Sequence, residues 1–158
     1  MEKALLAIGK VAGAFILFLF CLWALLIFVD IPFGKKGKGA SLQEILTECG
    51  KERFAQYMPF ETGESYYDYS RNFTRWSLVV FGTLESEKID HDMLEKYYQK
   101  KEQDHWINTG GFDERIRKEI DSAFEGGKSV FSNGMGGALI HICLSPDEKY
   151  YIVELWHR

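Results

Sequence analysis

The sequence lacks the spacings that mark metal proteins and metalloenzymes. Its three cysteines form no Cys-x-x-Cys pair, and its four histidines form no His-Glu-x-x-His pattern. Those spacings are typical of structural and catalytic zinc sites. The sequence therefore predicts no metal and no cofactor, and it identifies no catalytic residue.

A phosphate-binding loop is also missing. Residues 132–137 (SNGMGG) are rich in glycine, but a strand is expected after them, and no Gly-Lys-Ser/Thr triplet occurs. A phosphate loop needs a helix after it to aim backbone N–H groups at the anion. We interpret this stretch as a turn between strands, in which Asn133 and Met135 are candidates for contact with a protein partner.

The chain has no excess of basic residues. It carries 19 basic and 23 acidic residues, of which five basic and two acidic ones precede Ser41, leaving 14 and 21 and a net charge of −7. Nucleic-acid binding needs a basic footprint against the phosphates, so no nucleic-acid partner is expected. The charge fits a soluble domain held off an anionic bilayer, or a domain that meets a basic protein partner.

One long run contains no charged residue at all. Residues 11–29 read VAGAFILFLFCLWALLIFV, and about 20 apolar residues suffice for a helix to cross a bilayer. The run is too long for a secretory signal, and no small-residue cleavage site follows it. We predict a single-pass membrane anchor over residues 1–30, with a transmembrane helix at about 11–29.

Two signals bear on the side of the membrane. Lys3 and Lys10 precede the run and Lys35, Lys36 and Lys38 follow it, so the positive-inside rule favours a cytoplasmic domain by one charge. A very short N-terminal tail before an anchor and a larger domain commonly accompanies translocation instead. We expect the cell inner membrane, with the domain on the periplasmic or extracytoplasmic side.

The rest of the chain divides into a linker and one domain. Residues 31–40 (IPFGKKGKGA) are rich in Gly and Lys without apolar periodicity, which is typical of a linker. Residues 41–158 are enough for one domain that buries its own core.

Capping residues and apolar periodicity predict helices over residues 41–57, 90–101 and 113–125. β-Branched and aromatic residues predict a strand or hairpin across residues 65–84, and the C-terminus reads as a second hairpin. The order of elements predicts an α+β fold, with a mainly antiparallel sheet and about three helices on one face.

Aromatic residues are concentrated between residues 57 and 81. Tyrosine and tryptophan are favoured at protein interfaces because they bury area and keep a polar tip. Half of these side chains belong to the core of any such domain, and the others are candidates for an exposed recognition face. The partner-binding candidates are Tyr66, Tyr67, Asp68, Tyr69 and Trp76.

The leading hypothesis is a membrane-anchored, non-enzymatic protein-binding module. It could be an inhibitor or immunity-type protein, or an accessory subunit of an envelope complex. A first alternative is a membrane-tethered hydrolase or thiol enzyme that uses Cys143 with His141, which lie two residues apart on one strand face. That alternative requires both side chains to line an open pocket.

A second alternative is a small-ligand or lipid-binding domain with a deep apolar cavity beneath the sheet. Cys49 and Cys143 are the only cysteines after the anchor. They either form a disulfide or remain as two packed thiols.

Overall fold

The computed structural model divides the chain into two compact units, Met1–Pro32 and Phe33–Arg158. The residues that the structure describes are 13–23, 33–72, 75–101, 107–135 and 137–157. In the first unit, residues 13–23 are helical, and their large apolar side chains are 46–67% exposed. Within the described ranges, no helix has the length and apolar character needed to cross a bilayer. Residues 11–12 and 24–29 of the predicted transmembrane helix lie outside those ranges.

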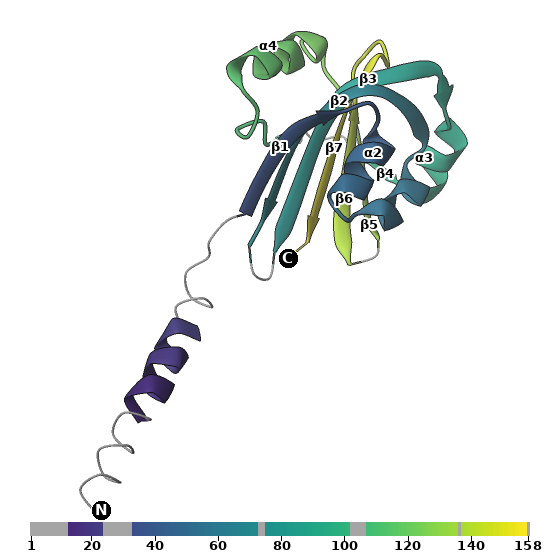
Figure 1. The fold of residues 1–158 in the computed structure, drawn as a ribbon. Helices are drawn as coiled ribbons and strands as arrows, with labels where there is room; N and C mark the ends of the chain where they lie inside the picture. The colour runs from purple at the N-terminus through teal and green to yellow at the C-terminus, as the bar shows by residue number, and fades with distance from the viewer. Residues whose placement is uncertain (1–12, 24–32, 73–74, 102–106, 136, 158) are drawn as a thin grey trace, which may run out of the picture. The chain divides into compact units, whose positions relative to one another are not determined.

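The second unit has an α+β fold built on one antiparallel sheet, in which the described residues form seven strands in the order β1-β2-β3-β7-β6-β5-β4 (Figure 1). Together with residues 13–23, the described part of the chain has five helices. The elements of the second unit are β1 (Phe33–Gly39), α2 (Leu42–Glu48), the 3-10 helix η1 (Glu52–Tyr57), β2 (Phe60–Arg71), β3 (Trp76–Ile89), α3 (His91–Tyr97), β4 (Gln99–Lys101), α4 (Glu114–Ala123), β5 (Ser129–Met135), β6 (Ala138–Leu144) and β7 (Tyr150–His157).

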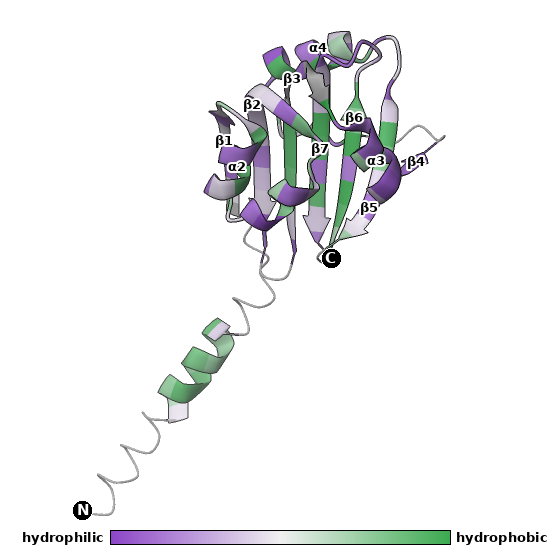
Figure 2. Cartoon of the chain, turned by 90° about the vertical axis from the view of Figure 1, so that its right-hand side faces the viewer, coloured by the Kyte–Doolittle hydropathy of each residue, from purple (hydrophilic) through white to green (hydrophobic). Residues whose placement is uncertain are grey.

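The central strands are apolar on both faces, and Figure 2 shows their hydrophobic residues in green. Successive side chains of a strand point to opposite faces. In β3, Leu78 and Val80 belong to the core cluster that includes residues of α2, η1 and α3, whereas Val79 and Phe81 belong to a second cluster with Ile116 and others of α4. The sheet is therefore covered on both sides (Figure 1). The expectation that all helices lie on one face was wrong, because β3, β6 and β7 have two faces to bury.

Several predicted elements are confirmed. The C-terminal hairpin is β6 and β7, and of the strand or hairpin predicted across residues 65–84, the hairpin is present as β2 and β3. The predicted N-caps are present as well, since Ser41, Asp90 and Asp113 each accept a hydrogen bond from the backbone N–H three residues on. Local signals of this kind act over a few residues, so the sequence alone carries them.

The segment expected to be a linker contains a strand instead. β1 pairs with β2 from Phe33↔Arg71 to Gly39↔Ser65. A Cβ at Gly37 would lie 2.8 Å from the ring of Tyr67, so glycine there lets that ring pack against the β1 backbone. Lysine-rich edge strands are common because the charges discourage pairing with further chains. The Gly and Lys composition thus reflects an edge strand that lacks apolar periodicity.

Two predicted helices are shorter than expected. The first ends at Glu48, and Gly50 with a φ of +65° follows before the 3-10 helix η1 begins. The helix expected to reach Lys101 ends at Tyr97, because Tyr98 is extended and its hydroxyl donates a hydrogen bond to the Tyr57 carbonyl at 2.6 Å. Gln99–Lys101 then pairs with β5 as β4. The backbone conformation of Gly50 overrides the helical pattern in the first case, and the hydrogen bond of Tyr98 to Tyr57 overrides it in the second.

Candidate functional site

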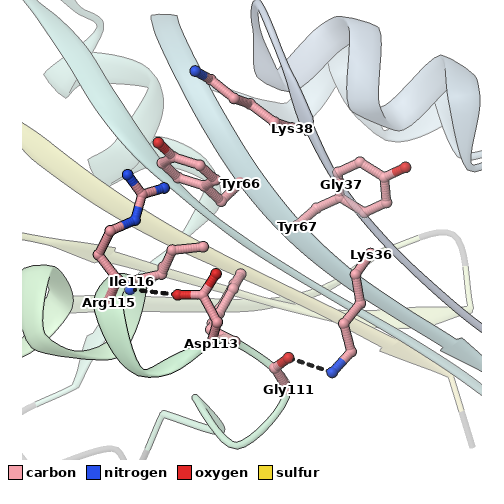
Figure 3. Close-up of a pocket in the computed structure, with 10 residues that line it drawn as sticks. Lys36, Gly37, Lys38, Tyr66, Tyr67, Gly111, Asp113, Arg115 and Ile116 are labelled. Atoms are coloured by element: carbon pink, nitrogen blue, oxygen red, sulfur yellow. Dashed lines mark hydrogen bonds between the residues drawn. The ribbon is translucent and has the colours of Figure 1, made fainter.

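A cleft of about 420 Å³ opens where the first two strands meet the start of α4 (Figure 3). Residues of β1 and β2 form one wall, and the turn before α4 with the first residues of that helix forms the other. The lining residues are Lys36, Gly37, Lys38, Tyr66, Tyr67, Gly111, Phe112, Asp113, Arg115 and Ile116.

Three of these residues are basic and one is acidic. Tyr66 lies between Lys38 and Arg115, with the Lys38 Nζ 5.6 Å and the Arg115 guanidinium carbon 5.9 Å from its ring centroid (Figure 3). Asp113, the one acidic residue of the lining, accepts a hydrogen bond from the Ile116 N–H at 2.9 Å. The lining residues therefore carry a net charge of +2 on a domain whose net charge is negative, and Glu64 and Asp68 lie next to them.

Two of the three cations already have partners. Lys38 lies 2.6 Å from Glu64, and this contact raises the pKa of Lys38 and lowers the pKa of Glu64. Lys36 donates a hydrogen bond to the Gly111 carbonyl. For Arg115, no carboxylate among the described residues lies within salt-bridge distance. Its guanidinium is the cation with the most hydrogen-bonding capacity left for a ligand.

The turn before α4 approaches β2 closely because Gly111 has no side chain. A Cβ at this position would lie 1.4 Å from Oδ2 of Asp68. Ile116 of α4 is 7% exposed and packs in the second core cluster. The helix, its preceding turn and the two strands thus hold the basic side chains on packed elements. Such a site suits one carboxylate or phosphate group, because Arg115 can form paired N–H···O bonds with either.

The structure separates the predicted partner-binding residues of β2 and β3. Tyr66 and Tyr67 both line the cleft, and Asp68 lies on the same strand face as Tyr66. Tyr67 also belongs to the core cluster on the other face, against which Tyr69 and Trp76 pack. Tyr67 is only 2% exposed. It is a core residue with no exposed recognition face, because β1 covers what would otherwise be a sheet edge.

Asn133 and Met135 were expected in a flexible turn and lie in β5 instead. The Asn133 amide donates a hydrogen bond to the Tyr97 carbonyl, and Met135 packs against the core. Both residues are on the α3 side of the sheet and outside the cleft.

His141 and Cys143 share a strand face, as predicted, but Cys143 does not line an open pocket. Cys143 is fully buried in the cluster beneath α4, and this burial raises the pKa of its thiol to about 12. His141 is 8% exposed, with Nδ1 3.8 Å from Glu154, whose other oxygen accepts a hydrogen bond from the Asn108 N–H. A protonated, enclosed thiol is a poor nucleophile, so the thiol-enzyme hypothesis loses its structural basis.

The two cysteines of the domain are free thiols. Cys49 packs against the cluster that includes α2, and Cys143 lies in the cluster on the opposite side of the sheet. The disulfide alternative is therefore wrong, because the sheet stands between the two sulfur atoms.

The basic residues of the cleft were not among the sequence candidates. Lys36 and Lys38 were assigned to the linker, although their spacing of two places them on one face of any strand. Arg115 is in the first turn of α4, and its closeness to Tyr66 depends on the crossing of the sheet and the helix. The lysine spacing was a usable signal, whereas the contribution of Arg115 required the tertiary fold.

Among the described residues, no group of three or more His, Cys, Asp and Glu side chains could hold a metal ion. Comparison of the chain with family models, with curated proteins and with solved structures found no match.

Proposed function

We propose that the chain is a single-pass membrane-anchored, non-enzymatic binding module whose cationic cleft takes a carboxylate of a protein partner. The observation that carries the proposal is Arg115, which faces Tyr66 across the cleft and has no carboxylate within salt-bridge distance among the described residues. An incoming carboxylate would supply that counter-charge through a bidentate contact.

The cleft is ready for such a group before it binds. Lys36 and Lys38 are already fixed by Gly111 and Glu64, and Tyr66 donates a hydrogen bond to Glu64 at 3.2 Å. Side chains held in place lose less conformational freedom on binding, which favours affinity. Tyrosine and arginine are also the residue types that carry most binding energy at interfaces.

The charge of the whole domain narrows the kind of partner. Residues 33–158 have 17 basic and 21 acidic residues, and their net charge of −4 favours a basic protein surface, whereas the cleft itself favours an acidic group. A partner that satisfies both is a basic protein whose acidic loop or C-terminal carboxylate enters the cleft. An inhibitor or immunity-type protein, or an accessory subunit of an envelope complex, fits this description.

The membrane anchor is supported by the sequence of residues 11–29, which has 19 residues and no charge. The described part of the run, residues 13–23, is a helix whose large apolar side chains are exposed. A helix that is apolar on every side needs an apolar environment around it. We propose that this environment is the cell inner membrane, with the domain on the periplasmic or extracytoplasmic side.

Extraction of membranes at alkaline pH tests the anchor. The full chain should stay in the membrane pellet, whereas Phe18→Arg combined with Leu22→Arg should release it, because each arginine at mid-membrane costs about 2.5–3.5 kcal/mol. Phe18→Leu with Leu22→Phe is the matched control and should stay in the pellet. Release of the unmodified chain would contradict the anchor. Digestion of the domain by protease added outside right-side-out vesicles would place it on the outer side.

Photo-crosslinking in the host cell tests the cleft. A photoreactive amino acid at Tyr66 should capture one discrete protein, and the same probe at the exposed Tyr97 of α3 should not. Arg115→Glu should abolish the adduct, whereas Arg117→Glu, the same charge reversal at an exposed position of α4, should keep it. Equal adducts from both probe positions, or an adduct that survives Arg115→Glu, would rule out the cleft as the binding site.

A small anionic ligand is the second candidate, and the volume of the cleft favours it. Ligand pockets span roughly 300–1,000 Å³, and the cleft has about 420 Å³. A small carboxylate that binds here would give no protein adduct at Tyr66, yet it would raise the melting temperature of the unmodified chain and not that of Arg115→Glu.

A further inference from the structure

One end of the sheet is formed by a row of paired residues on four neighbouring strands. The register places Phe33 opposite Arg71, Arg71 opposite Trp76, and Trp76 opposite His157. The start of β1, the end of β2, the start of β3 and the end of β7 therefore lie together at this end (Figure 1).

Basic side chains gather at this end, and we call Lys51, Arg53, Arg71 and Arg75 the basic end. Lys51 places its Nζ 3.8 Å from the centroid of the Trp76 ring. The pKa of Lys51 is lowered by burial, and further by the nearby charges of Arg71 and Arg53. Arg75 lies in the connection from β2 to β3, where its N–H donates a hydrogen bond to the Asn72 side chain at 2.7 Å.

Few acidic groups offset these charges locally. Glu52 precedes Arg53 in η1, and it is the only carboxylate that perturbs the pKa of Lys51. Among the described residues, no carboxylate lies within salt-bridge distance of the four basic side chains. Arg53, Arg71 and Arg75 are exposed. These groups repel one another, so an anionic surface placed against them would relieve a repulsion as well as form new contacts.

Trp76 contacts both the basic end and the packed aromatic rings next to it. Its ring stacks on His157 with centroids 6.2 Å apart and contacts Phe54 at 5.7 Å. Arg53 in turn lies 4.7 Å from the Phe54 ring. Lys51 and Arg53 therefore lie against packed aromatic rings, which reduces the ordering that these two side chains need when they bind.

Two acidic residues lie at the opposite end of the sheet. Asp147 and Glu148 lie in the connection from β6 to β7, at the far end of β7 from His157. Lys149 pairs with Asp147 at 3.2 Å, which leaves Glu148 to contact His91 at 3.4 Å. The domain Phe33–Arg158 has 17 basic and 21 acidic residues, a net charge of −4, and four of its basic residues gather at the end where β1 begins.

The chain length between the apolar run and β1 is short. Only Asp30, Ile31 and Pro32 separate Val29 from Phe33, and four fully extended steps span at most about 14 Å. If residues 11–29 cross the bilayer, the covalent chain keeps Phe33 within that distance of the end of the run. The headgroup region adds roughly 5–8 Å to each side of the hydrocarbon core, so the row that contains Phe33 is within reach of phospholipid headgroups.

We propose that the basic end docks on the anionic phospholipid surface of the membrane that holds the anchor, an inference that rests on the anchor of the proposed function. Arg53, Arg71 and Arg75 contact the phosphates, and Lys51 adds its charge from the face of Trp76. Docking orients the domain so that the acidic β6–β7 end points away from the bilayer.

Arginine labelling of the full chain in lipid nanodiscs tests the docking. Phenylglyoxal should modify Arg53, Arg71 and Arg75 more slowly in phosphatidylglycerol discs than in phosphatidylcholine discs. Arg117 of α4 should react equally in both lipids and is the internal reference. High salt should remove the difference, because it screens the attraction.

A pair of double variants gives the control. Arg71→Gln with Arg75→Gln should weaken docking by about twenty-five-fold, from roughly fivefold per basic residue near an anionic surface, and Arg53 should lose its protection. Lys100→Gln with Lys101→Gln removes the same charge from exposed positions of β4 and should leave Arg53 protected.

The outcomes separate the two proposals. Equal labelling in both lipids by a chain that inserts into both would overturn the docking and leave the anchor standing. Failure of the full chain to insert into either disc would overturn the anchor, and the docking with it. Loss of Arg53 protection in the β4 variants as well would show a general charge effect and would also overturn the docking.

Discussion

The chemistry of Cys143 depends strongly on its surroundings. The side chain is 0% exposed, and its thiol pKa is raised to about 12 by burial. Iodoacetamide at pH 8 should therefore leave Cys143 unmodified in the native chain while it alkylates Cys49, and both should react in urea. Peptide mass spectrometry gives the extent at each position. Rapid native alkylation of Cys143 would contradict the closed packing beneath α4.

The same pKa shift predicts how stability changes at alkaline pH. The native pKa of Cys143 lies above the value of about 8.5 for an unfolded thiol, so the protonated thiol stabilises the fold below about pH 8. This contribution is lost as pH rises from there toward 12, by about 1.4 kcal/mol for each pH unit. Urea unfolding should show a steeper decline between pH 8.5 and 10.5 for the unmodified chain than for Cys143→Ala.

Gly82 is required by the close contact of β3 with β2. A Cβ there would lie 2.4 Å from the Ser65 hydroxyl and 2.8 Å from the Glu64 carbonyl. Ser65 cannot easily move, because its hydroxyl is 2.7 Å from that of the buried Tyr151. Gly82→Ala should lower the free energy of unfolding by about 1–3 kcal/mol, the usual cost of overpacking. In urea unfolding, Gly134→Ala is the control and should change little, since its Cβ would meet nothing within 4 Å.

At the scale of elements, the cap of α4 can be tested alone. The Asp113 side chain accepts the Ile116 N–H at 2.9 Å, and loss of an N-cap of this type costs about 1 kcal/mol. Asp113→Ala should reduce unfolding free energy by that amount, and Asp121→Ala, an exposed acidic residue within the same helix, should have a smaller effect. Equal effects in denaturant titrations would mean that charge, and not the cap, is responsible.

The elements also show which parts of the fold were predictable. Caps at Ser41, Asp90 and Asp113 are local signals, and all three are present. β1 and β4 were missed because their strand character comes from partners far away in the chain. β1 pairs with β2 across residues 33–71, and β4 pairs with β5 across residues 99–132. Neither strand has apolar alternation of its own, so nothing local distinguished them from a linker and from a helix end.

The candidate site was predictable only in part for the same reason. Tyr66 was identified from its aromatic cluster, and it lines the cleft. Arg115 lies 49 positions further along the chain and reaches Tyr66 only because α4 packs on the second face of the sheet. The sequence indicated aromatic side chains near a sheet edge. The combination of charges that suits a carboxylate depends on how α4 packs against the sheet, and the sequence alone does not show that packing.

At the scale of the whole molecule, the boundary of the domain decides what folds independently. Both core clusters lie within Phe33–Arg158, so a chain of residues 33–158 should unfold in urea as a single transition. The boundary suggested by the sequence, residue 41, would delete β1. That deletion removes the strand that pairs along β2 and the Gly37 backbone under Tyr67.

The two truncated chains, residues 33–158 and residues 41–158, are therefore expected to differ in stability. Removal of β1 exposes Tyr67 and frees the edge of β2, and it should cost roughly 2 kcal/mol or more, since each lost ladder hydrogen bond contributes about 0.5–1.5 kcal/mol net. Residues 41–158 should accordingly unfold at a lower urea concentration than residues 33–158, with faster exchange of the β2 amides. Identical midpoints would mean that residues 33–39 are a linker after all. A lower urea midpoint for residues 41–158 would show that the strand carrying Lys36 and Lys38 stabilises the domain. Variants at these two lysines must then be tested for folding before their binding is measured.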